Sequence, residues 1–123
     1  MVLDTNILIY AAKPESGVLR RWLSDPDAAI SVVSRIEAFG FWGISEEETA
    51  ALQGVLQTLP EAALTEPVVE QAITLRQHRK IGLADSIIAA TALVHHLPLV
   101  TRNTDDFRQI VGLQLIDPFA LEA

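Results

Sequence analysis

Four acidic residues lie where the chain passes from one predicted element to the next, and carboxylates in such places can bind a metal ion or transfer a proton. Asp4 follows an apolar pair at the N-terminus, Glu37 comes one helical turn after an apolar run, Asp85 opens an apolar helix, and Asp106 follows another short apolar strand. Ligands of open parallel sheets bind beyond the carboxyl ends of the strands. We therefore expect these four side chains to share one rim of the fold.

Carboxylates gathered in this way imply a cation, because they would otherwise repel one another and raise each other's pKa. The chain has no cysteine, which excludes a thiolate metal site and a thiol nucleophile, and its three histidines do not converge on the acids. Hard oxygen ligands select Mg²⁺ or Mn²⁺. The predicted metal site consists of Asp4, Glu37, Asp85 and Asp106, with Asn6, Thr101 and Asn103 in supporting positions.

Three of these acids also have a purely structural explanation. Asp4 is a favoured residue type for a helix N-cap. Ser34, three residues before Glu37, has the spacing of a capping box, and Asn103 with Asp106 has the same spacing. Each explanation is sound for its own residue, but it does not account for four acids at one predicted rim.

Asp85 is the acid that capping explains least well. It lies at the start of a strongly apolar helix, where a carboxylate interacts favourably with the helix dipole. Helical spacing puts Ala89 and Ala92 on the face of Asp85, and such small residues would let the helix lie close to the sheet. At the fourth position Asp105 competes with Asp106, and we prefer Asp106 because Phe107 can anchor the short helix beside it.

The elements that must position these residues follow from the apolar pattern. The predicted strands are Val2–Leu3 running into Asp4, Ala29–Val33, Leu99–Thr101 and Leu113–Ile116, with a short fifth strand near Ala62–Leu64. The predicted helices are Val18–Leu23, Ser34–Phe41, Glu46–Leu56, Pro67–His78, Ala84–His95 and Asp105–Ile110. Strands that alternate with helices indicate an α/β fold, an α-β-α sandwich with a mainly parallel central sheet.

Composition sets the remaining limits. A length of 123 residues predicts a single domain over 1–123. No apolar run reaches the length of a membrane span and no signal peptide is evident, so we expect a cytoplasmic protein without a membrane partner. A net charge of -7 argues against broad binding to nucleic acid unless bound cations and local basic residues help. The basic candidates are Arg35, Arg79, Lys80 and Arg102.

Four segments together resemble a known family. They are Leu3–Ile9, Ser34 with Glu37, Leu83–Ala90 and Val100–Phe107, in that order. With them the chain resembles PIN-domain nucleases, in particular the VapC-like toxins of toxin–antitoxin pairs. The resemblance implies that Asp4, Glu37 and Asp85 are metal-site residues and that Asp106 takes the more variable fourth position. Some relatives carry an acid where Asn103 stands, so Asn103, Asp105 and Asp106 remain alternatives there.

The resemblance also implies a function. We expect a metal-dependent endoribonuclease in which Mg²⁺ or Mn²⁺ activates water for attack on an RNA phosphodiester, with a homodimer and a cognate antitoxin as partners. The alternatives are a housekeeping RNA-processing PIN nuclease and a PIN scaffold that only binds a partner. A further alternative is a Mg²⁺-binding phosphoacceptor module, but Glu37 and the helix-borne Asp85 fit neither of the places where its acids should stand.

Overall fold

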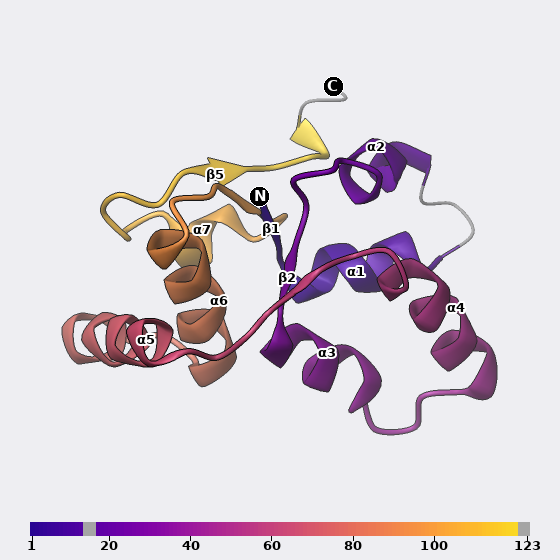
Figure 1. The fold of residues 1–123 in the computed structure, drawn as a ribbon, viewed down its shortest axis with the longest axis horizontal. Helices are drawn as coiled ribbons and strands as arrows, with labels where there is room; N and C mark the ends of the chain where they lie inside the picture. Colours follow the sequence, from indigo (N-terminus) through magenta and orange to yellow (C-terminus); the bar gives the residue numbers. More distant parts are fainter. Residues whose placement is uncertain (14–16, 121–123) are drawn as a thin grey trace.

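Figure 1 shows the fold in a computed structural model, which describes residues 1–13 and 17–120. The strands are β1 (Val2–Leu3), β2 (Ile30–Ser31), β3 (Glu61–Ala62), β4 (Leu99–Val100) and β5 (Leu115–Ile116). The helices are α1 (Thr5–Ala11), the 3-10 turn η1 (Gly17–Leu19), α2 (Arg20–Leu23), α3 (Val32–Phe39), α4 (Glu46–Leu56), α5 (Glu66–His78), α6 (Leu83–Val94) and α7 (Thr104–Phe107).

The strands run parallel throughout the described residues. β1 pairs with β4, β4 with β5, and β2 with β3. A parallel bridge between Val2 and Ala29 joins β1 to β2, which gives the spatial order β3-β2-β1-β4-β5. The predicted α/β fold with a mainly parallel sheet is therefore confirmed. A two-residue strand forms at each of the five predicted places, and β3 begins one residue before the predicted Ala62–Leu64.

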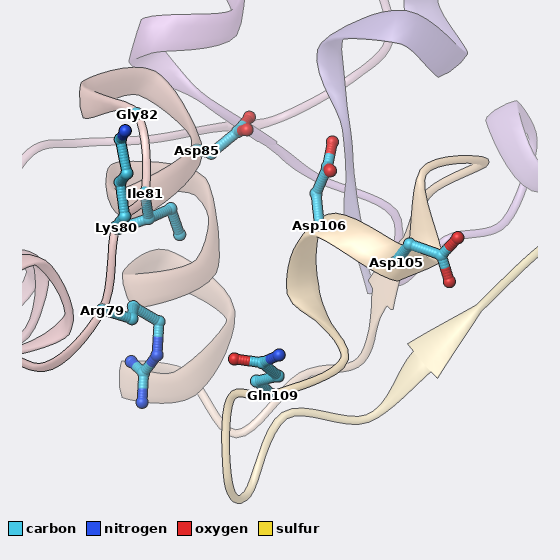
Figure 2. A pocket seen from close by; sticks show the side chains of 8 residues that line it. All are labelled: Arg79, Lys80, Ile81, Gly82, Asp85, Asp105, Asp106 and Gln109. Atoms are coloured by element: carbon cyan, nitrogen blue, oxygen red, sulfur yellow. The ribbon is translucent and has the colours of Figure 1, made fainter.

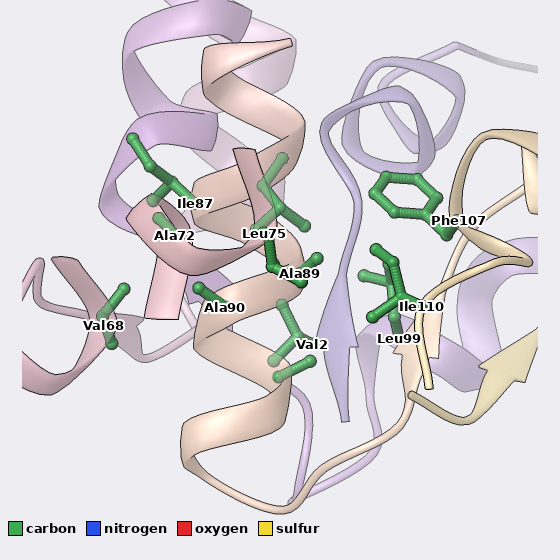
Figure 3. Packing of buried hydrophobic residues seen from close by; sticks show 12 residues of the cluster. Val2, Val68, Ala72, Leu75, Ile87, Ala89, Ala90, Leu99, Phe107 and Ile110 are labelled. Atoms are coloured by element: carbon green, nitrogen blue, oxygen red, sulfur yellow. The ribbon is translucent and has the colours of Figure 1, made fainter. Parts of the chain in front are cut away.

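Consecutive strand residues supply two separate cores, because side chains alternate between the faces of a sheet. Val2 and Leu99 belong to a cluster with α5, α6 and α7, which Figure 3 shows. Leu3 and Val100 belong to a second cluster with α1 and α2. Helices thus cover both faces, and the carboxyl ends of β1 and β4 lie side by side in the middle of the sheet.

Two local predictions were wrong near the second strand. The strand expected over Ala29–Val33 ends at Ser31, because Ser31 caps α3 by accepting a hydrogen bond from the Val33 amide at 3.2 Å. Ser34 therefore lies inside α3 and is buried, so the capping box between Ser34 and Glu37 does not exist. The acid at position 37 needs another explanation.

The other differences concern short elements. The helix α1 was missing from the expected elements, since its apolar run is too short to separate a helix from a strand by periodicity. The last predicted helix ends at Phe107 instead of Ile110, and Asn103 makes no side-chain cap there, so the proposed pair with Asp106 is absent. Within the described residues, no helix has both the length and the apolar character needed to cross a membrane.

Candidate active site

Asp4 lies at the carboxyl end of β1 and is the N-cap of α1. It is almost fully buried, with 4% of its surface exposed. One carboxylate oxygen, Oδ1, accepts from the Thr5 amide at 2.8 Å, and the other, Oδ2, accepts from the Thr101 hydroxyl at 2.8 Å. Burial raises the pKa of Asp4, the two hydrogen bonds lower it, and the charges of Glu37 and Asp106 raise it further. Asp4 thus combines a capping role with a place beside other acids.

Thr101 connects Asp4 to the end of β4. Its fully buried hydroxyl donates to Asp4 and accepts from the Asn103 amide at 3.0 Å, which fixes the loop toward α7. The contribution of Asn103 to this contact is its backbone, while its side chain is exposed. Asn6 is also exposed, and no hydrogen bond in the described residues ties its side chain to Asp4. Of the three supporting positions, Thr101 makes the direct contact.

Glu37 reaches the site from α3 and is held by Thr5, which the sequence analysis assigned no role, and Thr5 in turn contacts Ser34, which was expected to form a capping box. Its Oε1 accepts from the Thr5 hydroxyl at 2.6 Å, and the same hydroxyl lies 2.9 Å from Ser34 Oγ. Thr5 and Ser34 are both buried. The signal was the position of each residue: Thr5 directly follows Asp4, and Ser34 precedes Glu37 by one helical turn. These hydroxyls fix Glu37 relative to Asp4.

Asp85 is half-buried at the third position of α6. Burial is the main cause that raises its pKa to about 6, and the charges of Asp4, Asp106 and Glu37 add to the effect in that order. Ala89 and Ala92 on the same helix are fully buried, and α6 packs on β1 and β2. The small residues therefore let the helix approach the sheet, as the sequence predicted. This close packing brings Asp85 near enough for the charges of the other acids to raise its pKa.

The two neighbouring acids of α7 have different surroundings. Asp106 is one of the charges that raise the pKa of both Asp4 and Asp85. Asp105 forms an exposed ion pair with Arg108, with 2.6 Å between Oδ1 and Nη2. Asp85 and Asp106 project toward the same region from α6 and α7, whereas Asp105 points to the other side of α7 (Figure 2). We refer below to Asp4, Glu37, Asp85 and Asp106 as the acidic cluster.

A pocket of about 430 Å³ opens beside the acidic cluster. Figure 2 shows Asp85 and Asp106 at one end of it and Gln109 further along, and Asp105 also contributes to the lining, although its carboxylate points away from Asp85 and Asp106. The segment that links α5 to α6 supplies Arg79 and Lys80 to the same pocket. The pocket therefore carries negative charge at one end and positive charge along one wall, so an anionic ligand would meet the basic residues directly and the acids through a bound cation.

The acidic cluster has the donor chemistry of a site for a hard divalent cation. Every candidate donor is an oxygen, and burial together with the neighbouring carboxylates raises the pKa values of Asp4 and Asp85. In the described residues no three acidic or histidine side chains stand close enough to form a ready-made cage. This arrangement fits Mg²⁺, which usually keeps several waters and binds only one or two protein carboxylates directly.

An all-parallel α/β sheet with acids gathered at the carboxyl ends of its central strands is the class of fold and site found in PIN domains. Residues 1–113 match the PIN domain family. The chain therefore belongs to the PIN-domain family and, by its relatives, to the VapC ribonucleases within it.

Similar proteins support this assignment over the whole chain. Ribonuclease VapC10 of Mycobacterium tuberculosis (strain H37Rv) is 34% identical over 132 residues, covering 98% of this chain and 94% of the relative. The tRNA(fMet)-specific endonuclease VapC of Shigella flexneri is 30% identical over 128 residues, covering 94% and 96%. A solved toxin–antitoxin complex from Klebsiella pneumoniae has 33% identity and a TM-score of 0.76, covering 95% of this chain and 96% of that chain.

Proposed function

We propose that this chain is the ribonuclease toxin of a toxin–antitoxin pair and that it hydrolyses RNA phosphodiester bonds with Mg²⁺ or Mn²⁺. The observation that carries the proposal is the convergence of the acidic cluster: Asp4 lies at the end of β1, Glu37 contacts the adjacent Thr5, and Asp85 and Asp106 line one pocket. Asp4, Glu37 and Asp106 come from three separate parts of the chain, and the charge of each raises the pKa of Asp85. Asp4 is buried and Asp85 is half-buried, and like charges gathered around them weaken a fold unless a ligand compensates them.

In this proposal Asp4 and Asp85, the two less exposed acids, hold the ion most directly. When bound, the ion would lower the pKa of a water molecule and stabilise the charge that develops on the phosphate. Thr101 and the Thr5 amide keep the carboxylate of Asp4 in one orientation. Glu37 would receive the proton of the attacking water at Oε2, because its Oε1 already accepts from the Thr5 hydroxyl. Asp106 would orient water around the ion.

The similar proteins and the exposed apolar side chains both indicate that this chain binds other protein chains. Because the similar Klebsiella pneumoniae structure is a toxin–antitoxin complex, we expect a cognate antitoxin here as well, and the net charge of -7 suits a basic antitoxin segment. Ile36, Phe41 and Trp42 are exposed apolar side chains that a partner protein or the second copy of a homodimer would cover. We also expect a cytoplasmic location, where the RNA substrate would be available.

The test is cleavage of a panel of structured RNAs by the purified protein in Mg²⁺, Mn²⁺ or EDTA. We expect cutting with either ion and none in EDTA, and cutting reduced by about 10²- to 10³-fold in an Asp85→Asn preparation, which controls for contaminating ribonuclease. Cutting that persists in EDTA would contradict the metal site. If the protein cuts RNA but its induction leaves growth and translation unchanged, a housekeeping nuclease replaces the toxin.

Replacing Thr5 tests whether Glu37 depends on its buried hydroxyl partner. Thr5→Val keeps the shape of the side chain but removes the donor to Glu37 Oε1 and the contact with Ser34. We expect RNA cleavage to fall by about 10- to 100-fold, the usual effect of losing a group that orients a metal-site residue. Thr5→Ser retains the hydroxyl and should keep most of the activity. Equal activity in both variants would exclude this positioning role.

A further inference from the structure

The four basic residues singled out in the sequence differ in whether other side chains of the protein contact their charged groups. Arg35 forms a two-point ion pair with Glu61, at 2.7 and 3.1 Å. Arg102 lies over the rings of Tyr10 and Phe119, with 5.2 and 4.7 Å to the ring centroids. Both guanidinium groups are therefore engaged by the fold itself, and neither lines the pocket beside Asp85.

Arg79 and Lys80 are different, because within residues 1–13 and 17–120 neither side chain makes an ion pair or a side-chain hydrogen bond. Both line the pocket that contains Asp85, yet the neighbours that alter the pKa of Asp85 are all carboxylates. Arg79, Lys80 and Asp85 thus border one pocket, and the described residues show no ion pair between either cation and Asp85.

The chain holds these two cations at a fixed offset from Asp85. α5 ends at His78, and Arg79 leaves the helix with extended backbone angles, φ -159° and ψ 159°. Gly82 is already the N-cap of α6, so the connection is only a few residues long. α5 and α6 pack against each other, which anchors both ends of this connection. A short, anchored segment can present Arg79 and Lys80 to a ligand without a large cost in ordering.

We propose that Arg79 and Lys80 form a phosphate-binding wall that holds the RNA strand through phosphates next to the one at the acidic cluster. The inference rests on the proposed function, since it assigns the substrate's neighbouring phosphates to this wall. An RNA strand carries a charge on every nucleotide, and its phosphates are bound chiefly by lysine and arginine. In a chain with net charge -7, two cations that line one pocket, and that form no ion pair within the described residues, supply the local attraction that the whole protein lacks.

The experiment measures binding separately from cleavage. A 5′-fluorescein single-stranded RNA 12-mer of mixed sequence is titrated in EDTA, where no cleavage is expected, at KCl concentrations from 25 to 150 mM. Each lost phosphate contact should reduce the slope of log K against log salt by about 0.7, which is roughly 5-fold in affinity at 100 mM salt. Arg79→Gln and Lys80→Gln should each show this change, and the double variant about twice the change in slope.

Two control variants separate charge from shape and from general electrostatics. Gln109→Ala alters the same pocket without changing charge and should leave the slope unchanged. Arg20→Gln removes an exposed charge on α2, far from the pocket, and should also leave it unchanged (Figure 1). In steady-state cleavage with Mg²⁺ the double variant should raise KM by 10-fold or more, while kcat changes less than 2-fold.

The outcomes distinguish this inference from the proposed function. If the wild-type protein cuts RNA and the double variant keeps the wild-type salt slope and KM, Arg79 and Lys80 do not bind phosphate, but the protein is still a nuclease. If the wild-type protein binds RNA without cutting it and the double variant has a smaller salt slope, the phosphate-binding role of Arg79 and Lys80 is confirmed and the nuclease assignment is wrong. Wild-type protein with no measurable affinity for the 12-mer, or equal loss in Arg20→Gln, would overturn the wall.

Discussion

Replacing Asp85 with asparagine should lower metal-dependent RNA cleavage by about 10²- to 10³-fold, the size expected when one electrostatic stabiliser of a transition state is removed. Asparagine keeps the shape of the side chain but removes a charge that would hold the ion together with Asp4. The matched control is Asp105→Asn. Asp105 lies on α7 like Asp106, but its carboxylate pairs with Arg108 at the surface. Steady-state cleavage of one RNA in Mg²⁺ should therefore separate the two variants, and similar losses would contradict the assignment of Asp106 over Asp105.

Asp85→Asn lowers activity, but it should raise the stability of the fold when no metal is present. The pKa of Asp85 is raised from 3.8 to about 6 in the folded protein, so the folded state binds more protons than the unfolded state between these values. The free energy of unfolding must then fall as pH rises through this window. Asparagine carries no charge and avoids this loss.

The size of the gain follows from two opposing effects. Because Asp85 is half-buried and screened by water, avoiding the loss is worth about 1 to 2 kcal/mol. The favourable interaction of a first-turn carboxylate with the helix dipole, about 0.3 to 1 kcal/mol, offsets part of it. We expect Asp85→Asn to be about 1 kcal/mol more stable than wild type at pH 7 in EDTA, and to have no advantage at pH 4.

Urea unfolding in EDTA at pH 4, 5, 6 and 7 measures this difference. Asp105→Asn serves again as the control, because an exposed ion pair contributes at most about 1 kcal/mol and should show no step near pH 6. A variant that is less stable than wild type at pH 7 would mean that Asp85 has a structural role as its main function. The expected result, a gain in stability with a loss of activity, is typical of residues kept for function.

The acids of the candidate site could be predicted because short apolar runs in the sequence identify where the strands end. Asp4 follows directly on a buried pair of strand residues, and Asp85 starts a helix whose small residues require close packing. Neither inference needs knowledge of distant contacts. The sequence also placed an acid on the short helix after β4. Whether Asp105 or Asp106 joins the site depends on which side of this four-residue helix faces the sheet.

The groups that orient these acids could not be predicted in the same way. Thr101 and Asp4 are 97 residues apart, and their hydrogen bond exists only because β1 and β4 are neighbours. Glu37 was first explained by a capping box, an explanation that failed because Ser31, three residues earlier, already caps α3. Local patterns identify the residue types that can cap a helix, but tertiary packing decides which of several candidates does so.

The α7 helix shows how strongly the site depends on such packing. Four residues cannot form a stable helix alone, because nucleation costs more than one turn of hydrogen bonds returns. Phe107, with 1% of its surface exposed, packs in the core cluster with Val2, Leu99 and Ile110 (Figure 3). Its burial holds α7 against the sheet, and with it the adjacent Asp106.

Phe107→Ala should therefore destabilise the protein by about 3 to 5 kcal/mol, the range for removing a buried phenyl ring. Phe41→Ala is the control on the surface, since Phe41 is 61% exposed and its loss should change stability by less than about 0.5 kcal/mol. Thermal and urea unfolding measure both. If the two variants are equally stable, Phe107 does not anchor α7.

Because Phe107→Ala risks failing to fold, a milder pair of variants tests the link between this core and the acidic cluster. Phe107→Leu and Val68→Ala both remove volume from the same buried cluster, and each should cost about 1 to 3 kcal/mol. Only Phe107 is adjacent to Asp106, whereas Val68 lies on α5. At a temperature where both variants are fully folded, cleavage should fall in Phe107→Leu and stay near the wild-type rate in Val68→Ala. Equal rates would mean that Asp106 holds its place without the ring, and that α7 is fixed instead by the hydrogen bond from the Asn103 amide to Thr101.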